Sequence, residues 1–569
     1  MPNPAGPPID ARARPSGQFP SNRRGWPSHA TTAWTFFVLA LPNLLLAFLA
    51  VDVAPWRRAA LCGASLALIL LAWMTLPPRW FLRLSVPLFV LVPFETFHIL
   101  VLAAPSTTGM IRSLLDTARS EIRDVAGSLV APVLVVLLLP ALQFAASLAY
   151  QRHHSSTASA AFPTAMGRIV ATFFVASAAT GLLLAASEAP VSSRSTHRAF
   201  QSTFPLGTLD KIGVFAIDEF RQHRAISVAK GFRWDARLEN PLGTRSTIVL
   251  VIGETSRAGN WSAYGYGRPT TPHLEGSPDV LRFEDATSGA NLTEIALPQI
   301  LTRSTPERPF ASDSSTSLLA GFREAGYRTW WISTQNPAGR ESSRTGKIVA
   351  DADHRQFLTT PGKATRPFDH ELLPALESAL ADTFPRKLVV LHTLGSHHAY
   401  ANRYPAEFAR FGGRQELAAY DNSVLYTDLV LSQILSRLRA VHGENAFLYL
   451  SDHGEALGEN GLYNHGRPHP VRAEIEIPFL VWISPELDRM RPGLLANLRS
   501  HLRSKIRSSD LGPTLMSIAG IESPLADRSS SLADSAYRER TRWVLTPQGD
   551  LVDADRLSGS SFHTGRTPR

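Results

Sequence analysis

The chain has 569 residues, which is too long for one ordinary hydrophobic core, so two or more domains are expected. Its formal net charge is +9, but the basic residues are dispersed and show no aromatic and basic pattern typical of RNA recognition, which argues against a nucleic-acid partner. The single cysteine, Cys62, lies within an apolar run, so the chain can form no internal disulfide and no thiolate metal site.

The first third of the chain is strongly apolar. Residues 1–32 are rich in Pro, Ser, Gly and Arg, which predicts a disordered N-terminus. Five apolar runs follow, each long enough or nearly long enough to cross a bilayer, at residues 35–51, 59–76, 84–104, 128–150 and 169–186. The pattern predicts an α-helical membrane domain of five spans over residues 33–187.

Basic residues in the connections indicate the orientation of these spans. Arginines precede the first run, and the second and fourth connections each hold two more, as expected of cytoplasmic loops. Arg57 and Arg58, in the short first connection, argue mildly against this arrangement. We therefore expect a multi-pass protein of a bacterial inner membrane with a cytoplasmic N-terminus. Five crossings would leave the part after about residue 188 in the periplasm.

Two features of the membrane part carry chemistry. Glu95 lies inside the third run, where an ionisable group is costly and usually faces a polar interior or the interface. In the third connection Ser113, Thr117 and Glu121 recur at intervals of four, which places them on one face of a helix. We expect this helix, near residues 107–125, to lie at the outer membrane surface, with a solvated linking helix as the alternative.

The remaining sequence has the composition of a soluble α/β protein. Residues 188–244 form a linker with an amphipathic stretch at 208–223. Apolar, β-branched runs predict buried strands at 247–253, 329–333, 387–392, 445–451, 477–483 and 542–545. Helical patterns between them, at 315–325, 371–381 and 421–438, predict a mainly parallel sheet between helices over residues 245–550, followed by a flexible tail at 551–569.

Acidic and imidazole side chains follow several of these strands. The carboxyl ends of parallel strands are where open α/β sheets place their ligands. Carboxylate oxygens and imidazole nitrogens together suit zinc or manganese. Each histidine alone is most often a packing or surface residue, but the set predicts a metal site that draws on Glu254, His397, Asp452, His453 and His465.

A metal site needs a nucleophile beside it to define a reaction. Thr255, Ser288 and Thr293 are the candidates, because a metal can lower the pKa of a hydroxyl without a catalytic histidine. Their spacing does not choose among them. The chain contains no nucleophile elbow with triad partners, no P-loop and no convincing dinucleotide-binding glycine pattern, so no dinucleotide cofactor is expected.

Several of these segments resemble the motifs of a known family. Residues 260–266 and 268–272 follow Glu254-Thr255-Ser256-Arg257 as in the opening motif of the phosphoethanolamine transferases, which are inner-membrane enzymes with an alkaline-phosphatase/sulfatase-type catalytic domain. The similarity continues through residues 392–397, 420–428 and 451–461, and it covers the five-span layout and nearly all of residues 245–525.

The resemblance implies roles for particular residues. Thr293 stands at the position of the metal-bound nucleophile, and Glu254, Asp452 and His453 match the other ligands of a tightly bound zinc. A second, weaker zinc or the transferred headgroup would be held by His397 and His465. His392 resembles a headgroup-site residue. Thr117 and Glu121 match a donor-contacting pattern, whereas Ser113 stands where the lipid A enzymes commonly have Asn.

The implied activity is transfer of phosphoethanolamine from phosphatidylethanolamine to lipopolysaccharide core, lipid A or another periplasmic glycan, with zinc favoured over manganese. The lipid A enzymes flank the nucleophile with a disulfide, but Gly289 and Gln299 occupy those positions here, which favours a cysteine-poor branch. A sulfatase-fold hydrolase, a phosphoglycerol transferase, or a membrane-anchored binding protein without catalysis are the alternatives.

Overall fold

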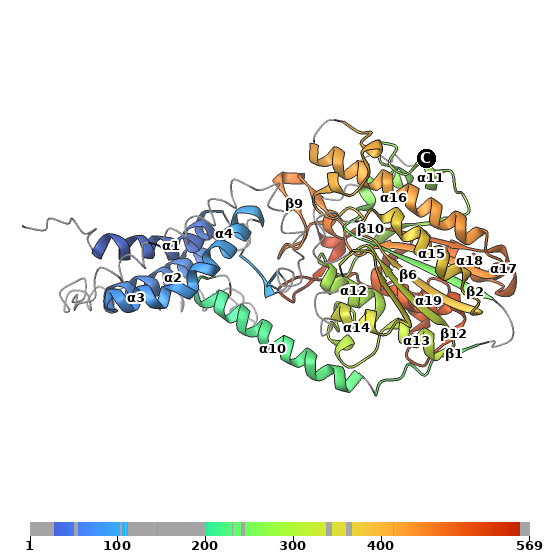
Figure 1. Ribbon diagram of the computed structural model, residues 1–569, viewed down its shortest axis with the longest axis horizontal. Helices are drawn as coiled ribbons and strands as arrows, with labels where there is room; N and C mark the ends of the chain where they lie inside the picture. The colour runs from blue at the N-terminus through green and yellow to red at the C-terminus, as the bar shows by residue number, and fades with distance from the viewer. Residues whose placement is uncertain are drawn as a thin grey trace, which may run out of the picture.

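The computed structural model places the α-helical N-terminal part apart from a larger α/β domain (Figure 1). It describes residues 28–49, 55–102, 105–108, 110–111, 145, 201, 203–229, 231–239, 245–336, 344–359, 367–412 and 415–557. Ser113, Thr117 and Glu121 lie outside these residues, as does nearly all of the predicted spans 128–150 and 169–186.

Four α-helices make up the described N-terminal part: α1 (Ser28–Leu49), α2 (Pro55–Thr75), α3 (Pro78–Ser85) and α4 (Leu91–Leu102). Among the described residues no single helix combines the length and the apolar composition that a membrane crossing requires. Two consecutive helical segments, Trp80–Phe89 and Leu91–Leu100, do so together, with a bend of 50° between them. The five-span domain stays a prediction.

A long helix, α10 (Leu206–Ala229), leads from these helices to the α/β domain (Figure 1). It is anchored by a buried ion pair in which the Nζ of Lys211 lies 2.6 Å from an Oε1 of Glu95 in α4. The hydroxyls of Ser106 and Thr208 donate to the same oxygen at 2.6 and 2.7 Å. Glu95 therefore has a cationic partner and hydrogen bonds that offset its desolvation.

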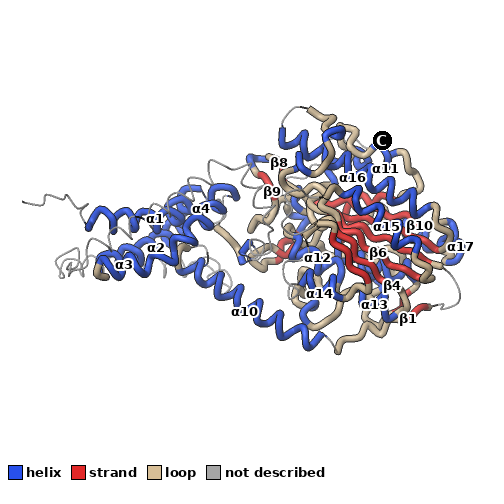
Figure 2. Tube along the Cα trace, in the orientation of Figure 1, coloured by secondary structure: helices blue, strands red, loops and turns tan. Residues whose placement is uncertain are grey.

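The α/β domain contains an eight-stranded sheet with helices on both faces (Figure 2). Seven strands run parallel to one another and only β10 runs antiparallel, which confirms the mainly parallel sheet. In spatial order the strands are β11 (Lys505–Arg507), β3 (Leu281–Thr287), β10 (Glu476–Ile483), β7 (Glu444–Ser451), β2 (Ser246–Gly253), β6 (Arg386–His392), β4 (Arg328–Ser333) and β5 (His354–Phe357).

The central strand β2 is buried on both faces, as its continuous apolar sequence predicts. Ile248, Leu250 and Ile252 point into one hydrophobic core, under α13 (Leu318–Glu324) and α19 (Leu511–Ala519). Val249 and Val251 point into the other, under α15 (Leu372–Ala381) and α16 (Gln415–Arg439). This strand is thus fixed from both sides, and its carboxyl end is a rigid position for a functional group.

Some sequence predictions need correction. The strand predicted at 477–483 is present as β10, but it runs against its neighbours. The strand predicted at 542–545 lies outside the main sheet, as β13 (Trp543–Leu545) paired with β14 (Leu551–Asp553). β14 falls within residues 551–569, the segment for which the sequence predicts a tail. The edge strands β5 and β11 and the mixed-polarity β3 escaped prediction because they lack long apolar runs.

Candidate active site

Three neighbouring strands end at the same place. Glu254 directly follows β2, Asp452 and His453 directly follow β7, and His392 is the last residue of β6. Since β7, β2 and β6 are adjacent and parallel, their carboxyl ends bring these four side chains to one edge of the sheet. This is the edge at which the sequence placed them.

Glu254, Asp452 and His453 form a compact, buried cluster whose ligand atoms all lie within 4.8 Å of one another. The Nε2 of His453 is 3.4 Å from the Oε1 of Glu254 and 3.5 Å from the Oδ2 of Asp452. Its Nδ1 lies 2.9 Å from the carbonyl oxygen of Gly454, which can only accept a hydrogen bond. Nδ1 therefore carries a proton, which leaves Nε2 as the ring nitrogen that can bind a cation lying between it and the carboxylates.

The cluster fits a cation. The Oδ1 of Asp452 accepts hydrogen bonds from the backbone amides of His453 and Thr255, at 2.7 and 3.1 Å. Its Oδ2 is buried and has no hydrogen-bond partner among the described residues. A buried carboxylate oxygen is costly unless a proton or a positive charge faces it. Two carboxylates and one imidazole are a donor set that zinc accepts. Gln335 donates to Oε2 of Glu254 at 2.9 Å and fixes its orientation.

The three candidate hydroxyls differ in access. The Oγ of Ser288 donates to the carbonyl of Asp452 at 2.5 Å, the Oγ1 of Thr255 donates to Glu254 at 2.7 Å, and both side chains are buried. Thr293 is partly exposed, and its Oγ1 lies 3.3 Å from each carboxylate oxygen of Glu254 and 3.2 Å from Nε2 of His453. Of the three, Thr293 is the hydroxyl that a substrate can reach.

Thr293 is also the first residue of α12 (Thr293–Leu301). The amino end of a helix carries unpaired backbone N–H groups and a partial positive charge, which favours anions. A phosphoryl group attached to or facing Thr293 would therefore meet a favourable electrostatic environment even apart from a metal ion.

A second cluster adjoins the first. His453, Glu455 and His465 present ligand atoms within 4.8 Å of one another. The Nδ1 of His465 lies 2.6 Å from Glu455, whose other oxygen accepts a hydrogen bond from Tyr400 at 2.7 Å. Burial raises the pKa of Glu455 to about 7 and lowers the pKa of His465 well below its ordinary value. Glu455, to which the sequence assigned no role, holds the ring of His465 with Nε2 directed away from it.

The other two predicted histidines stand apart from these clusters. His392 is buried, its Nδ1 lies 3.3 Å from the hydroxyl of Ser333, and burial lowers its pKa to about 4. His397 lies in the loop after β6, and its backbone amide donates to Leu394. The two metal-type clusters found among the described residues include neither histidine.

The loop at residues 288–292, which leads to Thr293, is held without a disulfide. The backbone amide of Gly289 donates to Ser508 at 3.1 Å, and its carbonyl accepts from the amide of Leu545 at 2.7 Å. A Cβ at Gly289 would lie only 2.0 Å from the Oε1 of Gln299, so the buried Gln299 side chain occupies the space beside this glycine.

The same loop is tied at its other end by a buried polar network. The Nδ2 of Asn291 donates to Glu474 at 2.6 Å and to the carbonyl of Arg467 at 3.0 Å. Glu474 also forms an ion pair with Arg467 at 3.1 Å. No sequence signal connects Asn291 to Arg467 and Glu474, because it lies 176 and 183 residues from them in the chain.

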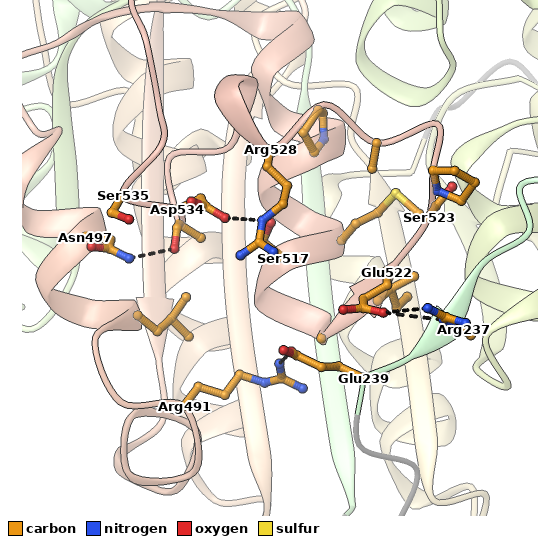
Figure 3. Close-up of a pocket in the computed structure, with 18 of the residues that line it drawn as sticks. Arg237, Glu239, Arg491, Asn497, Ser517, Glu522, Ser523, Arg528, Asp534 and Ser535 are labelled. Carbon is orange, nitrogen blue, oxygen red and sulfur yellow. Dashed lines mark hydrogen bonds and ion pairs between the residues drawn. The ribbon is translucent and has the colours of Figure 1, made fainter.

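A separate pocket of about 690 Å³ lies at the opposite edge of the sheet (Figure 3). Tyr327 marks this edge, since its hydroxyl contacts both Ser246 at the start of β2 and the carbonyl of Ala519 beside the pocket. Three arginines that line it are each paired with an acidic residue of the same pocket: Arg237 with Glu522, Arg491 with Glu239 and Arg528 with Asp534. With Asp235 as the one further charged residue of the lining, this pocket offers no excess positive charge to an anionic ligand.

Comparison with known proteins supports the assignment of the fold. Residues 246–521 match the model of the Sulfatase family. The chain is 29% identical over 334 residues to the phosphoethanolamine transferase EptC of Escherichia coli K12, covering 55% of this chain and 57% of EptC. It is 32% identical over 263 residues to EptA of Helicobacter pylori, with 43% and 49% covered. The aligned part is thus only about half the length of these relatives.

Solved structures also resemble this chain in fold. The C-terminal periplasmic domain of E. coli EptC in complex with Zn superposes with a TM-score of 0.52 and 27% identity, over 57% of this chain and 96% of that one. The integral membrane protein EptA of Neisseria meningitidis gives a TM-score of 0.70 over 90% of this chain and 99% of that one, at 21% identity, which speaks for the fold alone.

The α/β domain is therefore of the sulfatase type. The resemblance predicted from the motifs is confirmed: over about half of its length the chain is similar to phosphoethanolamine transferases.

Proposed function

We propose that this chain transfers phosphoethanolamine from phosphatidylethanolamine to an envelope glycan, such as lipopolysaccharide core or lipid A, through a covalent intermediate on Thr293. The observation that carries the proposal is the partly exposed Thr293 hydroxyl, 3.2–3.3 Å from His453 and Glu254. The relatives named phosphoethanolamine transferases support the headgroup.

In the first step the Oγ1 of Thr293 forms a bond to the phosphorus of the donor, and the bond from phosphorus to the glyceryl oxygen breaks. Diacylglycerol leaves with the proton that the threonine hydroxyl gives up. In the second step an acceptor oxygen attacks the same phosphorus and restores the Thr293 hydroxyl. The amino end of α12 stabilises the phosphoryl oxygens in both steps.

Glu254, Asp452, His453 and Thr293 would hold the catalytic zinc. When bound, zinc supplies Lewis-acid chemistry, which lowers the pKa of a coordinated hydroxyl and offsets charge on phosphoryl oxygens. The chain's own contribution is to aim these atoms: Gly454 fixes the ring of His453, and backbone amides fix Asp452.

Glu455 and His465 would face the transferred headgroup or a second, weaker zinc. The Glu455 contact orients the imidazole, which leaves Nε2 of His465 as an acceptor or ligand. We place His392 and His397 at the headgroup side of the site, and Thr117, Glu121 and Ser113 at the donor lipid. The five predicted spans would keep the periplasmic domain close to both lipid substrates.

The test is the intact mass of the purified full chain after incubation with phosphatidylethanolamine alone. Wild type is expected to gain one phosphoethanolamine group on Thr293, and Thr293→Ala to gain none. Phosphatidylglycerol in place of the donor distinguishes a phosphoglycerol transferase. Acceptor transfer by a protein that never carries the group on Thr293 would contradict the proposal.

The acceptor is found by mass spectrometry of lipid A and core oligosaccharide from cells with and without the protein. A new phosphoethanolamine on either fraction would identify it. An Asp452→Ala strain serves as the control, because the loss of this carboxylate removes a proposed zinc ligand while the chain remains in the membrane.

A further inference from the structure

A second cavity lies beside the carboxyl end of α12 and beside α19, and it adjoins the pocket of Figure 3, with which it shares Pro513, Met516 and Ala526. It has a volume of about 440 Å³, within the range of small-molecule sites. Arg507 at the carboxyl end of β11 and Trp543 at the start of β13 line it. These segments continue to Ser508 and Leu545, the two residues that hydrogen-bond to the backbone of Gly289.

Positive charge dominates the wall of this cavity, where four arginines face two acidic residues. Arg507 is paired with Asp510 at 2.5 Å. Arg540 is paired with Asp527 at 2.6 Å. These two guanidinium groups are therefore already neutralised, and Arg303, Arg308 and the carboxylate of Glu307 leave the wall of the cavity with a net charge of one positive unit.

Those two arginines, Arg303 and Arg308, form no ion pair with any residue that the structure describes. The guanidinium carbon of Arg303 lies 5.8 Å from the ring centre of Phe232, a cation–π contact that holds the side chain without neutralising it. Two guanidinium groups without carboxylates are the groups that bind phosphate or carboxylate ligands.

Two further side chains add polar and apolar contacts. Ser509 lines the cavity, although its hydroxyl oxygen is buried and has no hydrogen-bond partner among the described residues. Trp543 is half-buried and lines the same cavity with an aromatic ring. An aromatic ring beside guanidinium groups that form no ion pair matches a sugar ring that carries an anionic group.

We propose that this cavity binds an anionic sugar of the acceptor glycan, an inference that rests on the proposed function. The cavity includes Thr302, the residue after α12. Nine residues of helix separate Thr302 from Thr293, which corresponds to roughly 13 Å. An acceptor sugar bound here would lie within a short oligosaccharide of the transferred group, against the segments that hold the 288–292 loop.

The first experiment measures binding by the purified full chain in detergent, using glucose 1-phosphate, glucuronate and glucose in calorimetric titrations. At least one of the two anionic sugars is expected to bind, and glucose to bind at least tenfold more weakly. The better of the two identifies the anion as phosphate or carboxylate. Absence of binding by both anionic sugars would overturn the proposal.

Two double variants separate the pocket from general charge. Arg303→Glu with Arg308→Glu is expected to weaken binding of the anionic sugar at least tenfold. The control, Arg489→Glu with Arg556→Glu, makes the same change at side chains that are 72% and 86% exposed and lie outside the cavity. Equal weakening in both double variants would refute a specific site.

The second experiment compares two rates in each variant: labelling of Thr293 by the donor alone, and transfer to isolated lipopolysaccharide. In the Arg303 and Arg308 double variant, the ratio of transfer to labelling is expected to fall at least tenfold through a higher acceptor KM. An unchanged ratio would overturn the inference. Absence of labelling in wild type would instead refute the proposed function. The binding titrations would still show whether the cavity binds an anionic sugar.

Discussion

The hydrogen bond from Asn291 to Glu474 offers a direct test of how Thr293 is positioned. Glu474 is fully buried, and Asn291 donates to it at 2.6 Å from two residues before Thr293. A hydrogen bond to a charged group contributes about 1.5–3 kcal/mol. Asn291→Ala is therefore expected to lower the unfolding free energy of the α/β domain by about 2 kcal/mol.

The same change should slow the chemistry more than this loss of stability explains. Without its tie to Glu474 the loop is free to shift, and a displacement of about 1 Å in a reacting group can cost about 100-fold in rate. We expect labelling of Thr293 by phosphatidylethanolamine to slow by about tenfold to 100-fold, measured by intact mass at a temperature where the variant is fully folded.

Asn445→Ala is the matched control. Asn445 is also a buried asparagine, with hydrogen bonds to the backbone of Thr247 and Val441, but it lies at the amino end of β7, far from Thr293. It should lose similar stability and keep the wild-type labelling rate. Equal slowing in the Asn291 and Asn445 variants would refute the positioning role and leave only a contribution to stability.

Three further predictions concern pH, the ion pair and the metal. Burial lowers the pKa of His392 from 6.5 to about 4, so its contribution to stability is complete above pH 6.5 and is lost as pH falls toward 4, by about 3 kcal/mol. In His392→Gln, the urea concentration at the midpoint of unfolding should therefore depend less on pH between 6.5 and 4 than it does in wild type. An unchanged pH dependence would contradict the burial argument. Glu95→Gln or Lys211→Met alone should destabilise the full chain by about 3–5 kcal/mol, and the double variant by less than their sum, in thermal unfolding in detergent. A chelator should lower the Tm of wild type, and added zinc should restore it. In Asp452→Asn the Tm should not rise with zinc, and a rise would argue against Asp452 as a zinc ligand.

Local sequence patterns determined much of the α/β domain. The apolar run of β2 marks a strand buried on both faces, and a parallel sheet brings the ends of such strands to one edge. Glu254, Asp452 and His453 directly follow their strands, so their approach follows from strand order and direction alone. The motifs around these residues are also local in the sequence, so the similarity to the phosphoethanolamine transferases could be predicted without the structure.

The family resemblance singled out Thr293, but only the tertiary structure gave a physical reason to prefer it over Thr255 and Ser288, because access depends on what covers each side chain. It also supplied partners that no local pattern encodes. Asn291 meets Glu474 across 183 residues, and Glu95 meets Lys211 across 116. Hydrophobic periodicity sets which face of an element is buried, but these pairs depend on how separate elements pack against one another. That packing decides which buried charge is neutralised and how the loop before Thr293 is held.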